Sequence, residues 1–160
     1  MPQLEDFLAT WESEFQTTVR VFENYPVERL AYRPHEVSRT AHELMWTIAH
    51  EEGEMIEGCL RGSITFGEET PPKTKEALIR EYKKRHAALV KKVRKAGEEL
   101  FSKKIGFPMG KAKVMELSGK DWLWSLLHDQ IHHRGQLSVY LRLVGAKVPS
   151  IYGPSADEPW

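Results

Sequence analysis

The sequence predicts an all-α fold, an up-down four-helix bundle formed by a single domain over residues 1–160. Three observations favour it. Four long stretches repeat apolar residues at three- and four-residue steps, which gives each predicted helix one apolar face. Capping residues mark the beginnings of these stretches, and glycine or proline marks their ends. No repeat or long linker divides the chain, and its length favours one core.

The first two helices are predicted over residues 4–24 and about 40–60. The first ends before Pro26, which cannot continue a helix. Thr40 and Glu43 have the spacing of a capping box at the start of the second, and Gly62 permits its exit. The predicted inward residues of the first helix are Leu4, Phe7, Leu8, Trp11, Phe15, Val19 and Phe22, and those of the second are Leu44, Ile48, Met55 and Ile56.

The other two helices are predicted over residues 74–100 and 118–144. Thr74 caps the third, and its basic residues between 83 and 95 form a solvated face. Residues 102–117 are expected to be irregular or weakly extended. The fourth helix begins at a capping-box-like Ser118 and closes at Gly145. The tail is expected to be an ordered coil, because it carries side chains that need cover: Val148, Ile151, Tyr152 and Trp160.

Composition excludes several functions. Lys and Arg together equal Asp and Glu, so the formal net charge is zero, which argues against a nucleic-acid binder. No apolar run approaches the roughly 20 residues of a membrane span, and the first residues do not resemble a signal peptide. Cys59 is the single cysteine, so an intramolecular disulfide and a Cys-rich zinc site are excluded. We expect a cytoplasmic protein that binds neither membrane nor nucleic acid.

The stretch "LLHDQIHHRGQLSVYLR", residues 126–142, holds three histidines inside an otherwise apolar helix. Asp129 and His133 lie four residues apart and share a face with the larger apolar residues, so we expect them to point toward the core. His128 and His132 then lie nearer the edge. Either pair can present two ligands to one metal ion.

A third ligand is expected from the second helix. His50 lies in the middle of that helix, in "HELMWTIAHEEGE". His42 lies in the first turn and is expected to serve the helix end. His86, on the third helix, is expected to have a neutral role in or beside the core.

The stretch "HDQIHHRGQLSVYLRLVG", with "VPSIYGPSADE" after it, resembles the DinB/YfiT-like superfamily of metal-dependent proteins, and "RTAHELMWTIAHEE" resembles its second-helix motif. The resemblance covers nearly the whole chain. It implies a bundle of the DinB/YfiT-like type with an unusual connection order, usually dimeric. It also implies a divalent metal, zinc or nickel, bound by three histidines, and in some relatives transferase or isomerase reactions that use low-molecular-weight thiols.

Two positions depart from the family pattern. Asp129 stands where a histidine is common, and Thr47 stands where the second helix usually supplies its histidine. Three arrangements follow. His50, Asp129 and His133 form a site with two histidines and one carboxylate; or His128 and His132 replace the last two; or the protein binds no metal.

Two functions are compatible with this pattern. The first is a metal-dependent enzyme, either a hydrolase or a thiol transferase, in which the ion activates a water or a thiolate. The second is a non-catalytic dimeric bundle that binds a small molecule and keeps a vestigial site. In either case we expect a homodimer. Arg134 is expected to form a salt bridge between helices or to anchor an anionic substrate.

Overall fold

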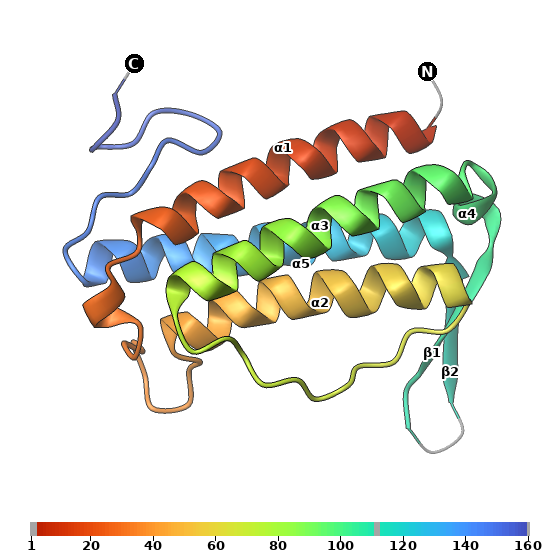
Figure 1. Ribbon diagram of the computed structural model, residues 1–160, viewed down its shortest axis with the longest axis horizontal. Helices are drawn as coiled ribbons and strands as arrows, with labels where there is room; N and C mark the ends of the chain where they lie inside the picture. The colour runs from red at the N-terminus through yellow and green to blue at the C-terminus, as the bar shows by residue number, and fades with distance from the viewer. Residues whose placement is uncertain (1–2, 111–112, 160) are drawn as a thin grey trace.

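The computed structural model describes residues 3–110 and 113–159, and this part of the chain is mostly helical (Figure 1). Four long helices lie side by side, and two short turns, a 3-10 turn and a one-turn helix, lie in the connections. The long helices are α1 (Gln3–Asn24), α2 (Ala41–Arg61), α3 (Lys75–Ala96) and α5 (Gly119–Leu143); the short turns are η1 (Val27–Arg29) and α4 (Glu99–Ser102).

The all-α expectation holds only approximately, because residues expected to be irregular form an antiparallel hairpin. Strand β1 (Lys104–Pro108) pairs with β2 (Val114–Ser118), with Ile105 opposite Leu117. Ile105 is buried, and its carbonyl accepts a hydrogen bond from the Trp122 indole at 3.0 Å. The hairpin therefore closes one end of the helical layer and places the start of α5.

The four helices do not simply alternate in direction, as an up-down order implies. In Figure 1, α2 and α3 run the same way, and α1 and α5 run the opposite way. A long connection, residues 62–74, carries the chain back along the molecule between α2 and α3. Helices α1 and α2 each contact both α3 and α5. This order makes α2 and α5 direct neighbours although they are far apart in sequence.

The predicted apolar faces are buried. Two clusters of side chains fill the space between the helices, one around Trp11 and Leu126 and one around Phe22 and Tyr82. Burial of this apolar surface is the main force that holds the four helices together. The first cluster takes residues 4–11 of α1 and the second takes residues 15–22, so the two clusters follow one another along the helices.

The predicted ends of α2 are confirmed at the atomic level, whereas α3 ends at Ala96, before the predicted Leu100, because Gly97 interrupts it. The Thr40 hydroxyl accepts from the Glu43 amide and the Glu43 carboxylate accepts from the Thr40 amide, so the capping box is complete. Gly62 ends α2 with φ of 100°, a backbone conformation that favours glycine. At the start of α5, a Cβ on Gly119 would overlap the Leu100 carbonyl oxygen, so glycine permits the close approach of α4.

The tail packs partly as expected. Val148 and Ile151 pack against the core, and the Asp157 carboxylate accepts hydrogen bonds from Arg142 and from the Val148 amide. Tyr152, however, is 69% exposed, although its hydroxyl bonds to Glu14 and the Arg134 guanidinium lies 5.3 Å from the centre of its ring. Trp160 lies outside the described residues. Between residues 3 and 110 and between 113 and 159, no helix combines the length and apolarity that a membrane crossing requires.

Candidate metal centre

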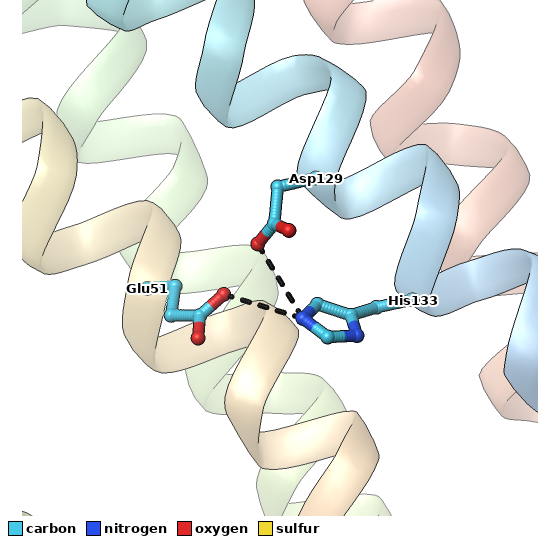
Figure 2. Close-up of side chains that lie close together, drawn as sticks. All are labelled: Glu51, Asp129 and His133. Atoms are coloured by element: carbon cyan, nitrogen blue, oxygen red, sulfur yellow. Dashed lines mark ion pairs between the residues drawn. The ribbon is translucent and has the colours of Figure 1, made fainter.

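Two helices bring three ligand-bearing side chains together. Asp129 and His133 lie one turn apart on α5, and Glu51 faces them from α2 (Figure 2). The His133 Nε2 atom is 3.4 Å from Asp129 Oδ2 and 3.8 Å from Glu51 Oε2. One ligand atom from each residue lies within 4.8 Å of the other two. We call these three residues the Glu51 site.

The Glu51 site lies at the edge of the seam between α2 and α5. The side chain of His133 is 12% exposed, that of Glu51 is 24% exposed and that of Asp129 is 49% exposed. We expected Asp129 and His133 to point into the core, but this face of α5 is rotated away from the core by about a quarter turn. The polar residues of α5 that are fully buried are instead Gln130 and Arg134. An edge position leaves the site open to small molecules.

The ring of His133 is oriented by Gln136, one turn later on α5. The His133 Nδ1 atom lies 3.0 Å from Gln136 Oε1, and the Gln136 amide nitrogen lies 3.1 Å from His132 Nε2. An amide oxygen only accepts hydrogen bonds, so His133 Nδ1 carries the proton. In the neutral ring, Nε2 then has a free lone pair directed at the two carboxylates. Metal-binding histidines are oriented by hydrogen bonds of this kind.

The two carboxylates of the site disfavour each other's charge. The pKa of Glu51 rises from 4.5 to about 8, first because the side chain is partly buried, then because it shares a hydrogen bond with Asp129 and feels its negative charge. The positive charge of Arg39 acts in the opposite direction. At neutral pH, Glu51 is therefore protonated as long as only protein groups face it. A cation between the carboxylates relieves their repulsion and displaces this proton.

The geometry fits one transition-metal ion. Zinc binds imidazole nitrogen and carboxylate oxygen at about 2.0–2.2 Å, which places the ligands of one tetrahedral ion roughly 3.3–3.6 Å from one another. The distances from His133 Nε2 to the two carboxylates are 3.4 and 3.8 Å, so they need little adjustment. Ligands from three side chains also leave coordination positions for water or substrate.

His50, the third ligand expected from the sequence, is not part of this group. Its Nε2 atom is 2.7 Å from the Gly67 carbonyl, its Nδ1 is 3.4 Å from Glu69, and its ring stacks on Trp46. Adjacent helical residues differ by about 100° in direction, so Glu51 turns toward α5 while His50 turns toward the connection over residues 62–74. One observation in the sequence pointed to Glu51, since it lies one turn after Thr47, the position where the family places its histidine.

The remaining histidines lie outside the site. His128 and His132 are exposed on α5, and within the described residues they belong to no group of three candidate ligands. His86 is buried and stacks on Phe15, so it lies in the core as expected, and its two ring nitrogens face the Glu52 and Glu12 carboxylates. Arg134 bonds to Glu14 and to the Tyr152 hydroxyl at the α1 side, so it links helices and tail and does not contact Glu51.

A second carboxylate cluster lies inside the molecule, and sequence reasoning missed it. Glu52 is completely buried, and its two oxygens accept hydrogen bonds from four side chains of α1, α3 and α5. We call this the Glu52 cluster. Its donors, with distances to Glu52, are Trp11 Nε1 (2.9 Å), Gln130 Nε2 (2.8 Å), His86 Nδ1 (2.9 Å) and the Tyr82 hydroxyl (3.4 Å).

Two cavities flank the Glu51 site. One, of about 330 Å³, is lined by Glu51 itself together with Arg39, Trp46, Thr47, His50 and residues 66–69. The other, of about 560 Å³, is lined by Gln136, Tyr140 and the connector before α2. Arg39 lines both. The site therefore has space beside it for a small molecule, on the scale of known ligand pockets.

Comparison with known proteins gives consistent matches. The model of the DinB family matches residues 1–159. The uncharacterized protein YrdA of Bacillus subtilis (strain 168) is 26% identical over 160 residues, which covers 97% of this chain and 91% of that protein.

Solved structures with a similar fold include two DinB-like proteins. One from Bacillus cereus ATCC 10987 has a TM-score of 0.78 at 22% identity, covering 95% of this chain and all of that one. YjoA from Bacillus subtilis has a TM-score of 0.74 at 21% identity, covering 90% and 96%. A mutant of a mycothiol-dependent maleylpyruvate isomerase has a TM-score of 0.61 at 14% identity, covering 91% of this chain and 64% of that one. At these identities the likeness shows a shared fold.

Proposed function

Because the chain belongs to the DinB family, we propose that it is a divalent-metal-dependent enzyme in which Glu51, Asp129 and His133 hold the metal. One observation carries the proposal: three ligand atoms from two helices lie within 4.8 Å of one another. The orientation of His133 by Gln136 and the proximity of two carboxylates support it. The ligand set thus differs from the three histidines that the family resemblance implies.

The metal we propose is nickel or zinc. Imidazole suits zinc, nickel and iron, whereas carboxylates also suit manganese. A set of one imidazole and two carboxylates therefore binds several divalent ions, and competition between them is part of the test below.

The reaction we propose is hydrolysis or thiol transfer. A bound divalent ion lowers the pKa of a water or thiol in its open position, which supplies a nucleophile at neutral pH. The protein's part is to hold the ligands and to admit the substrate. Gln136 fixes the tautomer of His133, and the cavity beside Glu51 receives the second reactant. Similarity to an isomerase described as mycothiol-dependent supports the thiol alternative.

The proposal extends to the whole protein. We take residues 1–160 as one domain with the four-helix bundle of the family, working as a homodimer in the cytoplasm. The match of the family model over residues 1–159 supports the single domain. Light scattering of the purified protein tests the dimer.

A second candidate is a non-catalytic bundle that binds a small molecule and keeps a vestigial metal site. Thr47 favours it, because that side chain lines the cavity beside Glu51 at the position of the family histidine and offers no imidazole. The two candidates differ in metal content, since a vestigial site purifies without metal and takes up none.

The test is elemental analysis of untagged protein after incubation with nickel, zinc and manganese and removal of free ions. We expect close to one ion per chain in the wild type and little in His133→Ala and Glu51→Gln. His50→Ala is the control, because His50 precedes Glu51 on α2 and lines the same cavity, but its Nε2 lies at the Gly67 carbonyl and not beside His133. Circular dichroism checks that each variant is folded.

Each outcome decides between the candidates. Metal that is lost with His133 and Glu51 but kept without His50 supports the enzyme. Metal that depends on His50 moves the site to the part of the cavity beside residues 66–69, where the His50 ring lies. A wild-type protein that takes up no metal overturns the proposal and leaves the non-catalytic bundle.

A further inference from the structure

Arg39 occupies the boundary between the two cavities beside the Glu51 site. It lines the cavity that contains Glu51 and also the cavity that contains Gln136, the residue that orients His133. It lies just before α2 and directly precedes Thr40, the residue that caps this helix. A side chain in this place faces any small molecule that reaches the site from either cavity.

The backbone of Arg39 is held firmly on both sides. The Tyr140 hydroxyl donates to the Arg39 carbonyl at 3.2 Å, which ties the residue to α5. The next residue, Thr40, is fixed by the capping box with Glu43. A rigid backbone reduces the entropy lost when the side chain binds a ligand.

The guanidinium of Arg39, in contrast, is uncommitted. Among the residues that the structure describes, it has no hydrogen-bond or ion-pair partner. Neighbouring arginines differ in this respect: Arg33 pairs with Glu43 at 3.8 Å, and Arg85 pairs with Glu69 and Glu81. The charge of Arg39 acts on the Glu51 and Glu43 carboxylates from beyond ion-pair distance, so within the described residues its hydrogen-bond donors remain available to a group from outside the chain.

The other charges around the cavity are mostly compensated. Glu69 is held by both Arg85 and His50. Glu51 belongs to the proposed metal site. Glu68, which lines the same cavity, has no cationic partner within the described part of the chain. Arg39 and Glu68 thus carry the uncompensated charges of this cavity. Arg39 attracts an anionic ligand, and Glu68 repels it.

We propose that Arg39 is a substrate-binding residue that pairs with a carboxylate, and that the substrate is a small monoanion which places its reacting group at the Glu51 site. This inference rests on the proposed function and names its substrate class. Arginine pairs with carboxylates through two parallel hydrogen bonds, which fixes orientation as well as adding affinity. Trp46 and Phe66 supply apolar wall to the same cavity, and its volume of about 330 Å³ suits a small organic molecule.

The test uses two thiols of nearly the same shape, 3-mercaptopropionate and its amide, of which only the first carries a carboxylate, and protein loaded with cobalt(II). The thiolate-to-cobalt absorption band reports binding without any need for turnover. We expect the wild type to bind the acid roughly tenfold more tightly than the amide, as one charge-assisted pair gives. Arg39→Gln should lose this preference, and Arg33→Gln, in the same connector, should keep it.

Glu68→Gln provides a test in the opposite direction. Removing its negative charge should strengthen binding of the acid about two- to fivefold and leave binding of the amide unchanged, because exposed charges interact modestly. Raising the salt concentration should reduce the preference for the acid in the wild type.

Failure of this inference is distinguishable from failure of the proposed function. If the wild type binds no cobalt, the metal site is wrong and the substrate assignment falls with it. If cobalt binds but acid and amide bind equally, or neither gives the band, the metal site stands and the role of Arg39 is wrong. The same holds if the preference for the acid survives in Arg39→Gln.

Discussion

Glu51 and Glu52 are neighbours in the sequence, and the structure places them in opposite surroundings. Glu52 points into the interior, where four side chains donate hydrogen bonds to it. Glu51 points toward a second carboxylate, Asp129, and toward the Nε2 atom of His133. The protein satisfies the charge of Glu52 with hydrogen bonds, whereas Glu51 keeps its proton at neutral pH until a cation replaces it. This contrast separates a carboxylate that stabilises the fold from one that is available to a ligand.

The strongest test of the contrast removes each carboxylate in turn. Glu52→Ala leaves several buried donors without a partner, so we expect the free energy of unfolding to fall by about 3–5 kcal/mol. Glu51→Ala removes a carboxyl group whose ionisation is disfavoured beside Asp129, and we expect little loss of stability in metal-free protein. Urea denaturation in the presence of a chelator measures both. Equal losses for the two variants would contradict the contrast.

Replacing each of the same two residues by glutamine separates the effect on stability from the effect on metal binding. Glu51→Gln should weaken binding of the metal by about 100-fold or more, because it removes a charged ligand, whereas loss of an outer-shell partner costs about 10–100-fold. Glu52→Gln should leave metal affinity unchanged in folded protein, since Glu52 does not reach the site. Competition with a coloured chelator gives both affinities, and a similar loss in both variants would sink the distinction.

The pH dependence of stability gives a third test. The pKa of Glu51 is about 8 in the folded chain and 4.5 in its unperturbed state, so the folded protein holds this proton more tightly. The contribution of Glu51 to stability is thus complete below pH 4.5 and is lost as the pH rises toward 8. Relative to metal-free wild type, Glu51→Gln should therefore gain stability between pH 5 and pH 8. A difference that stays constant over this range would refute the raised pKa.

The same group links metal binding to proton release. Because the ion displaces the proton of Glu51, metal affinity should rise with pH up to about 8 and then level off, as far as Glu51 determines it. Calorimetry in buffers of different ionisation enthalpy measures the protons released. Glu51→Gln is the control, and it should release fewer protons.

The smallest effect is expected at Gln136. Gln136→Leu removes the acceptor for His133 Nδ1 and frees the ring to change tautomer, so metal affinity should fall about tenfold. Ser138→Ala, on the same helix, is the matched control, because its hydroxyl bonds only to the Gly135 carbonyl. An unchanged affinity in Gln136→Leu would show that the seam between α2 and α5 positions His133 by itself.

The sequence predicted the helices well because their apolar period and caps are local signals. Thr40 with Glu43 gave the start of α2, and the stripe from Leu4 to Phe22 gave the buried face of α1. The hairpin was not predicted, because its strands are short and Ile105 is its only fully buried strand residue. Its pairing depends on packing against Trp122, which no short-range pattern reveals.

The two candidate ligands predicted on α5 lie together in the structure, whereas the candidate predicted on α2 lies elsewhere. Asp129 and His133 were identified because a separation of four residues fixes their common face on α5. On α2, His50 was chosen for its chemistry, whereas the rotation of α2 against α5 brings Glu51 to the seam. That rotation is set by the packing of two distant helices, and an error of one residue changes the direction of a side chain by about 100°.

The return of the chain between α2 and α3 has a consequence for the order of folding. Residues 62–74 divide the long helices into an early pair, which carries Glu51, and a late pair, which carries Asp129 and His133. Neither half of the chain can assemble the three ligands alone. Contacts between such distant segments form only after a large loop has closed, which makes them slow to form. The site therefore forms only when the two halves have docked. A newly made chain acquires it only after α5 has been synthesised and has packed against α2.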